Sequence, residues 1–219
     1  MPDPPRPPAA AAYRDRADAG ARLVAAFDAS WAGRPDTIVL GLARGGVPVA
    51  YEMARALGAP LDVFVVRKLG VPGHEELAFG ALASGGLRVL NEDLAAKLPA
   101  AVVAEVTARE AAALGEREAA YRGDRPPLDL RGRTVILVDD GLATGASMRA
   151  AVGAVRAQGP AEVVVAVPVG AATTCELLRT EADLVVCPLT PRHFIAVGSW
   201  YGDFSPTTDD EVRRLLTAG

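Results

Sequence analysis

Short apolar runs alternate along the chain with segments whose apolar residues recur at helical spacing. The run 135–138, Val-Ile-Leu-Val, is apolar at every position, as expected of a strand buried on both faces of a parallel sheet. The run 37–40, Thr-Ile-Val-Leu, likewise leads into a glycine-containing loop, and a helical segment follows each of the two loops. This order of strand, loop and helix predicts an α/β domain with a doubly wound, mostly parallel sheet.

The same patterns place the remaining elements. The runs 79–82 and 87–90 flank a Ser-Gly-Gly turn and predict a hairpin, so one strand is expected to run antiparallel. The Gly- and Pro-rich stretch 69–76 predicts a mobile loop, and 188–206 an irregular region. Further strands are predicted at 61–66, 162–167 and 183–187. Helices are predicted at 14–27, 47–57, 91–122 with an interruption near Pro99, after 139–147 up to about 157, at 171–180 and at 208–217. Thr208 and Glu211 form a capping box for the last helix.

The chain is expected to form a single domain over 13–219, preceded by a disordered tail. Residues 1–12 are rich in Pro and Ala and lack the order of a signal peptide. The longest apolar stretch, around 163–172, is broken by Pro168 and is too short to span a membrane. These features predict a soluble, cytoplasmic protein without a membrane partner.

The net charge argues against nucleic acid as a partner, and the cysteine pattern argues against a metal site or a disulfide framework. With 27 acidic and 23 basic side chains, the net charge of −4 provides no overall positive field for nucleic acid. Cys175 and Cys187 form no C-x-x-C motif and have no nearby histidine, so they predict neither a metal site nor a disulfide framework. We interpret both as small core residues in a reducing cytoplasm.

The most informative segment begins where the strand 135–138 ends, at Asp139 and Asp140. Two neighbouring carboxylates at the end of a buried strand need donors, and sugar hydroxyls are suitable donors. The next residues are small or carry hydroxyls, so backbone N–H groups can converge on an anion at a helix N-terminus. Together they describe a site for a ribose 5-phosphate; these residues are Gly141, Ala143, Thr144, Gly145, Ala146 and Ser147. The alternative is an ordinary strand-turn-helix with a capping Asp, for which one Asp would suffice.

Other phosphate and hydrolase motifs do not match. No G-x-x-x-x-G-K-[ST] occurs, and no G-x-G-x-x-G follows a predicted strand. The segment 74–78 has Ala where a zinc-protease helix needs its second His, and 145–149 lacks the closing Gly of a nucleophile elbow.

The segment 135–148, VILVDDGLATGASM, resembles the phosphoribosyl pyrophosphate motif of the type I phosphoribosyltransferases. Residues 41–46, GLARGG, resemble the pyrophosphate loop of that family, while 68–80 and 188–206 fall where its mobile catalytic loop and its base-covering hood lie. The resemblance covers 13–217 and extends to bacterial phosphoribosyltransferase-domain proteins of unassigned substrate. It implies a type I phosphoribosyltransferase fold with a small C-terminal hood.

The resemblance also implies roles for individual residues. Asp139 and Asp140 would hold the ribose hydroxyls. The backbone of 143–147, with the side chains of Thr144 and Ser147, would bind the 5-phosphate. Arg44, Gly45 and Gly46 would bind pyrophosphate, the glycines because a backbone must approach phosphate without a Cβ. Arg67 and Lys68 would add positive charge there, although a lysine at a strand end is also a common solvated residue.

The implied reaction transfers ribose 5-phosphate from phosphoribosyl pyrophosphate to a nitrogenous base and releases pyrophosphate. Catalysis then requires stabilisation of the leaving pyrophosphate by Mg²⁺ and cationic groups, and a closed loop that excludes water. The alternative is a non-catalytic protein that senses phosphoribosyl pyrophosphate or a nucleotide. A homodimer is implied by the resemblance alone.

The identity of the base is only partly written in the sequence. Hypoxanthine-guanine enzymes carry an aspartate at the place of Ala143, so the resemblance favours an adenine- or uracil-like base. The adenine enzymes carry a loop glutamate that transfers a proton, which makes Glu76, or Glu75, the candidate, although two loop glutamates can simply be solvated. In the hood, the candidates for base contact are Phe194, Val197, Trp200 and Tyr201, and packing onto the domain is the alternative role of the aromatic residues. Asp203 is the candidate metal ligand, with contact to an exocyclic amine of the base as the alternative.

Overall fold

The structure, a computed structural model, describes residues 11–123 and 125–218. Residues 1–10 of the predicted tail lie outside this part of the chain, and the side chains of Glu75 and Glu76 are also outside the description. None of the described helices combines the length and the apolar composition that crossing a membrane requires.

Five parallel strands form the main sheet, in the order β2-β1-β6-β7-β8. The predicted doubly wound sheet is therefore confirmed, and the apolar runs that predicted its strands are almost entirely buried. The strands are β1 (Thr37–Leu42), β2 (Leu61–Phe64), β6 (Thr134–Val138), β7 (Glu162–Ala166) and β8 (Leu184–Val186).

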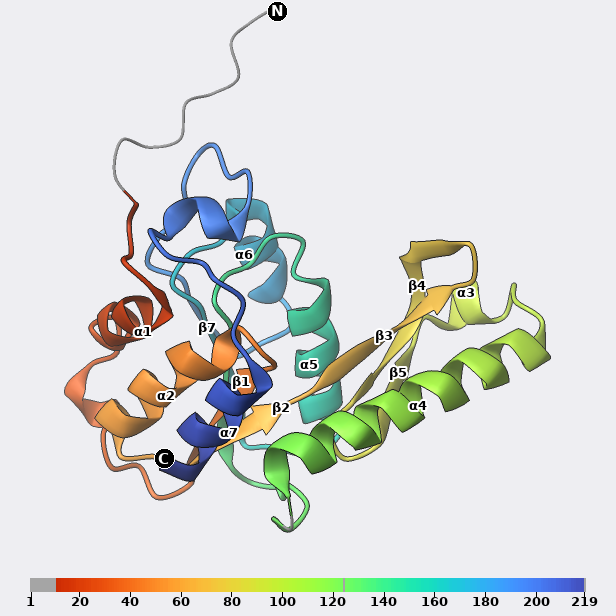
Figure 1. The fold of residues 1–219 in the computed structure, drawn as a ribbon, viewed down its shortest axis with the longest axis horizontal. Helices are drawn as coiled ribbons and strands as arrows, with labels where there is room; N and C mark the ends of the chain where they lie inside the picture. The colour runs from red at the N-terminus through yellow and green to blue at the C-terminus, as the bar shows by residue number, and fades with distance from the viewer. Residues whose placement is uncertain (1–10, 124, 219) are drawn as a thin grey trace, which may run out of the picture.

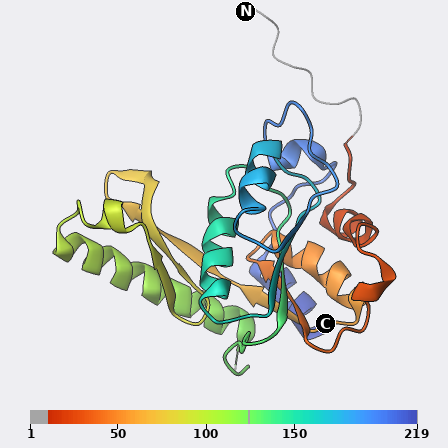
Figure 2. The same cartoon turned by 180° about the vertical axis from the view of Figure 1, so that it is seen from behind.

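Helices cover both faces of this sheet, as Figures 1 and 2 show from opposite sides. In β6, Ile136 and Val138 face a core shared with α2 and α7, while Val135 and Leu137 face a core shared with α5 and α6. This alternation explains why every residue of the strand is apolar, because both faces are covered. The α-helices of the body are α1 (Arg16–Val24), α2 (Gly46–Leu57), α5 (Ala146–Arg156), α6 (Ala172–Leu178) and α7 (Asp209–Ala218). Short 3₁₀ helices, η1 (Ala29–Trp31) and η2 (Val197–Trp200), precede β1 and α7.

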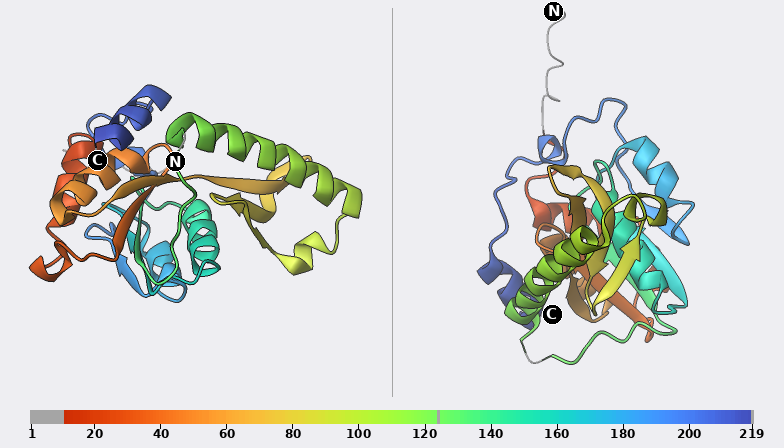
Figure 3. Two further views of the ribbon diagram at one scale, coloured as in Figure 1. Left: turned by 90° about the horizontal axis from the view of Figure 1, so that it is seen from below. Right: turned by 90° about the vertical axis from the view of Figure 1, so that its right-hand side faces the viewer.

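A second, antiparallel sheet extends from the body as an arm with a long helix along it (Figure 3). Its strands are β3 (Val66–Val71), β4 (His74–Ala83) and β5 (Leu87–Leu90), followed by α3 (Glu92–Ala95) and α4 (Ala100–Arg122). The predicted hairpin is β4-β5, and the helix is interrupted near Pro99 as expected. The antiparallel pairing thus belongs to a separate sheet, and the main sheet stays parallel throughout its described strands.

The predicted mobile loop is wrong as a secondary-structure assignment. Most of 69–76 belongs to β3 and β4, which pair across a two-residue turn at Pro72 and Gly73. Gly73 has φ +78°, a conformation that favours glycine, and irregular register near Gly70 interrupts the alternation of the strand. The Pro-Gly pair is therefore the turn of a hairpin.

Candidate active site

Three neighbouring strands deliver the predicted site residues to one edge of the main sheet. β1, the middle one of these three strands, leads into the loop with Arg44, and β6 beside it ends just before Asp139. On the other side of β1, β2 leads into β3, which carries Lys68. Because carboxyl ends of parallel strands meet at one edge, segments far apart in the chain become neighbours there.

The two acids lie against the glycines of the loop after β1. A Cβ built on Gly45 would stand 2.2 Å from Asp140 Oδ2, and one built on Gly46 would stand 3.2 Å from Asp139 Oδ1. Asp139 Oδ1 accepts the Asp140 N–H at 2.9 Å. The acidic pair therefore directly borders the loop that the sequence predicts to bind pyrophosphate.

The surroundings of this pair favour the neutral forms of the two carboxyl groups. Burial raises the pKa of Asp139 well above its ordinary value, and the neighbouring charge of Asp140 raises it further. Burial also raises the pKa of Asp140, and the Arg16 guanidinium offsets part of that effect. A ligand that donates hydrogen bonds to these carboxylates would stabilise their charged forms.

The turn after the acids exposes the groups expected of an anion site. Thr144 and Ser147 are exposed, and within the described part of the chain neither side chain forms a hydrogen bond. Gly145 has φ +71° immediately before α5, and no side chain caps that helix. Free N–H groups at an uncapped helix N-terminus attract anions. A hydrogen bond of 2.7 Å from Thr174 Oγ1 to the carbonyl of Ala143 holds the turn in place.

The cations predicted for pyrophosphate have different surroundings. Arg44 is exposed and pairs with Asp209 at 3.4 Å. Arg67 donates to Glu110 Oε2 from Nε at 2.9 Å and from Nη2 at 2.6 Å, so α4 already holds its guanidinium. Arg67, Lys68 and Arg109 nevertheless line a cavity of about 450 Å³ together with Ser147 of the turn.

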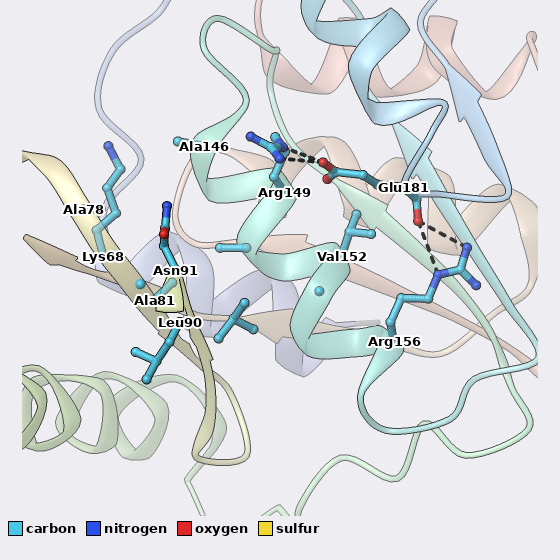
Figure 4. Close-up of a pocket in the computed structure, with 14 residues that line it drawn as sticks. Lys68, Ala78, Ala81, Leu90, Asn91, Ala146, Arg149, Val152, Arg156 and Glu181 are labelled. Carbon is cyan, nitrogen blue, oxygen red and sulfur yellow. Dashed lines mark hydrogen bonds and ion pairs between the residues drawn. The ribbon is translucent and has the colours of Figure 1, made fainter. Parts of the chain in front are cut away.

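Lys68 also faces a second cavity, of about 600 Å³, between the arm and α5 (Figure 4). Lys68 comes from β3 on one side of it, and Arg149 comes from α5 on the other, where Arg149 pairs with Glu181. The ammonium group of Lys68 is exposed and forms no ion pair with the described residues. Lys68 and Ala146, the first residue of α5, thus line the same cavity, and the role of Lys68 in binding pyrophosphate stays a prediction.

Glu110 is a charged group that the sequence reading did not single out. It is buried in α4 and accepts hydrogen bonds from Arg67 and Arg109. Burial raises its pKa, but the hydrogen bonds from Arg67 and Arg109 outweigh burial, so its pKa lies below the ordinary value. Its only sequence signal is a position in a long helix with little amphipathic pattern, which does not distinguish it from its neighbours.

Glu110→Gln should lower the free energy of unfolding at pH 7 by about 1–3 kcal/mol, because two charge-assisted hydrogen bonds lose their acceptor charge. A depressed pKa contributes stability that is present above the unfolded value and lost as pH falls through the folded value. The difference from wild type should therefore shrink in urea unfolding at acid pH. Glu105→Gln, an exposed change in the same helix, is the control; equal stability of the Glu110 variant at pH 7 would contradict the role.

The hood residues divide into two groups. Tyr201 is buried, stacks near Tyr13 and Phe204, and donates its hydroxyl to the carbonyl of Asp140 at 2.6 Å. Its ring therefore supports the acidic pair and is not a free stacking surface. Phe194, Val197 and Trp200 are half-buried, and Val197 lies against Gly141.

Asp203 is not grouped with other metal ligands. Its Oδ1 accepts hydrogen bonds from Ser205 N at 2.9 Å and Ser205 Oγ at 2.6 Å, which close a local turn. Among the described residues, no three His, Cys, Asp or Glu side chains gather in a way that could hold a metal ion. The carboxylate of Asp203 thus has a structural use, and the metal assignment gains no support from its position.

Comparison with known proteins agrees with this geometry. The family model for the phosphoribosyl transferase domain matches residues 11–199. A protein of known crystal structure from Thermus thermophilus, TT1426, is 45% identical, with a TM-score of 0.84, over 94% of this chain and 98% of that chain. A Mycobacterium tuberculosis CDC 1551 protein, provisionally named as a phosphoribosyl transferase, is 47% identical over 93% of this chain.

The match spans 46% of the length of that mycobacterial protein, so this chain corresponds to about half of that longer relative. The match to the family model, over residues 11–199, includes the loop after β1, the acidic pair and the turn before α5. The chain belongs to the phosphoribosyl transferase domain family.

Proposed function

We propose that this domain transfers ribose 5-phosphate from phosphoribosyl pyrophosphate to a nitrogenous base and releases pyrophosphate. The observation that carries the proposal is the placement of the uncapped α5 N-terminus directly after two carboxylates that border a glycine loop. A phosphate, a ribose diol and a pyrophosphate each find a suitable group there.

The chain's own residues would mainly bind and orient the donor. Asp139 and Asp140 accept hydrogen bonds from the ribose hydroxyls, and the turn 141–147 binds the 5-phosphate. Arg44 and the backbone of Gly45 and Gly46 bind the pyrophosphate, and Lys68 adds charge from the arm. As the bond from the anomeric carbon to pyrophosphate breaks, these cationic groups stabilise the negative charge on the leaving group. The attacking base supplies the nucleophile, so no protein nucleophile is needed.

The proposed base is adenine- or uracil-like. Ala143 is exposed in the turn and offers no titratable group, which supports this choice over a 6-oxopurine. Phe194, Val197 and Trp200 are the proposed base contacts. Glu76 stays the predicted proton-transfer residue; its backbone lies in β4 and its side chain lies outside the described residues.

Magnesium fits this site through the donor more than through protein ligands. Mg²⁺ commonly takes one or two carboxylates together with substrate phosphates, and it keeps several waters. The buried, under-compensated carboxylates beside the pyrophosphate loop are compatible with a nearby cation. When bound, the ion would neutralise charge on the leaving pyrophosphate.

Pyrophosphate release tests the activity. The protein is incubated with phosphoribosyl pyrophosphate, Mg²⁺ and a panel of bases, and we expect release with adenine- or uracil-like bases and none with hypoxanthine or guanine. A reaction without a base serves as the control. The Lys68→Ala variant should release pyrophosphate more slowly than the wild type, by roughly tenfold or more. Tight donor binding without turnover across the panel would instead identify a sensor.

The remaining expectations are separate proposals. Both cysteines are free, and Cys175 lies in the core, which supports a cytoplasmic location. The homodimer stays a prediction, which light scattering of the purified chain would test.

A further inference from the structure

Arg16, near the start of the chain, contacts the acidic pair 124 residues away. Its Nε donates to Asp140 Oδ2 at 2.8 Å, and both side chains are largely buried, with exposed fractions of 12% and 14%. Partly buried ion pairs of this kind hold their geometry better than surface pairs, because solvent competes less.

The remaining contacts of Arg16 fix its guanidinium in one position. Nη1 donates to the carbonyl of Ser205 at 2.7 Å, and the guanidinium carbon lies 4.0 Å from the centre of the Phe204 ring. Asp15 caps the helix in which Arg16 is the first residue. The cation is thus held by α1 and by the end of the hood at the same time.

Asp140 uses only one of its two carboxylate oxygens in these contacts. Oδ2 binds Arg16 and lies against Gly45, whereas Oδ1 forms no hydrogen bond or ion pair with the described residues. Tyr201 holds the backbone of the same residue through its carbonyl. The protein therefore fixes one oxygen and leaves the hydrogen-bonding capacity of the other unused among the described residues.

We propose that Arg16 is a positioning residue for donor binding: it fixes Asp140 through Oδ2 and so presents Oδ1 to a ribose hydroxyl. This inference rests on the proposed function, because it takes the ribose of the donor as the ligand. Arg16 itself contacts no reacting atom in this assignment.

The charge of Arg16 gives the proposal a measurable consequence. Asp140 faces Asp139 beside it, Arg16 from α1 and Tyr201 from the hood, while Gly45 contributes backbone only. Burial raises the pKa of Asp140, and Arg16 lowers it. Without Arg16 the pKa of Asp140 rises further. As the pH falls, the carboxylate is then protonated earlier, so donor binding should be lost at a higher pH than in the wild type.

The test measures the affinity of the whole chain for phosphoribosyl pyrophosphate with Mg²⁺ by calorimetry, from pH 5 to pH 8.5. For Arg16→Met we expect affinity about 10- to 100-fold weaker at pH 7.5. The pH at which affinity falls by half should also move upward. Arg16→Lys keeps the charge and should restore most of the affinity and the wild-type midpoint.

Arg22→Met is the matched control. Arg22 lies in the same helix, pairs with Asp18 at 3.2 Å and lies 5.7 Å from the Tyr13 ring centre, but it does not contact Asp140. It should bind the donor like wild type. Thermal unfolding of each variant shows whether it is folded at the temperature of the titration.

The outcomes separate this inference from the proposed function. Wild-type protein that does not bind the donor would overturn the proposed function itself. Wild-type binding with an unchanged Arg16→Met variant, or with an Arg22→Met variant that loses as much affinity, would overturn the positioning role alone. If Arg16→Met does not fold, Arg16→Gln replaces it, with the same expected loss of affinity and the same upward shift of the pH midpoint; wild-type affinity and midpoint in Arg16→Gln would overturn the role.

Discussion

Replacing Asp139 and Asp140 together by asparagine should abolish tight binding of phosphoribosyl pyrophosphate and leave the fold intact. Each carboxylate is proposed to accept a hydrogen bond from a ribose hydroxyl, and a hydrogen bond to a charged group contributes roughly 1.5–3 kcal/mol. Losing the charge of both acceptors should weaken donor binding by roughly 10²- to 10⁴-fold. Asparagine keeps the size of the side chain, so little repacking is expected at the loop after β1.

The two single variants should differ in stability. A pKa raised by folding contributes stability at low pH that is lost as pH rises through the folded value. Because burial and Asp140 raise the pKa of Asp139, Asp139→Asn should be as stable as wild type, or more stable, at pH 7. Burial also raises the pKa of Asp140, but Asp140→Asn should be less stable, because the cost of leaving the largely buried Arg16 without its charged partner exceeds the gain from removing the buried carboxylate.

Calorimetry of donor binding and urea unfolding at pH 7 measure both effects. Asp36→Asn combined with Asp93→Asn is a suitable control, since both residues are exposed and the net charge changes equally. Undiminished binding by the Asp139, Asp140 variant would remove the ribose assignment. Loss of binding by the control would instead indicate a general effect of net charge.

The sequence predicted those parts of the site that are local in the chain. The strand β6, the two acids and the turn before α5 form one continuous segment, and its apolar run and glycines determine its structure almost unaided. The adjacency of the loop after β1 followed from the parallel sheet, because neighbouring strands end at the same edge.

Contacts between distant segments could not be predicted from the sequence in this way. Arg16 and Asp140 are 124 residues apart, and nothing in the pattern around Arg16 distinguishes it from Arg22, the other arginine of its helix. The sequence suggests Tyr201 for its aromatic ring, whereas in the structure its hydroxyl donates to the carbonyl of Asp140. Both roles depend on how the N-terminal helix and the hood pack onto the sheet edge.

The arm shows a different limit. Gly70, Pro72 and Gly73 suggested a loop by composition, but strand pairing with β4 supplies hydrogen bonds that composition does not reveal. The irregular register at Gly70 also removes the alternation by which a strand is normally recognised. The tertiary pairing therefore overrides the local preference of these residues.

Gly45→Ala should also lose donor binding, by roughly 10- to 10³-fold, because the methyl group competes with Asp140 for space. Gly45 has φ −61°, which any residue can adopt, so glycine is required there for space and not for backbone conformation. The nearest atom to a built Cβ is Asp140 Oδ2, at 2.2 Å. The carboxylate must move, and its contacts with Arg16 and the donor change with it.

Two further glycine variants distinguish this displacement from general overpacking. A Cβ on Gly46 would stand 2.4 Å from the carbonyl oxygen of Val138, which is backbone and cannot rotate away, so Gly46→Ala should mainly lower stability, by roughly 1–3 kcal/mol. A Cβ built on Gly115 in α4 would meet no atom within 4 Å beyond its chain neighbours and the backbone of its own helix, so Gly115→Ala should raise stability by about 0.5–1 kcal/mol. Urea unfolding and donor calorimetry on all three separate the two effects. Gly45→Ala that binds normally would show that the position of Asp140 does not govern donor affinity, because its carboxylate cannot stay in place beside the added methyl group.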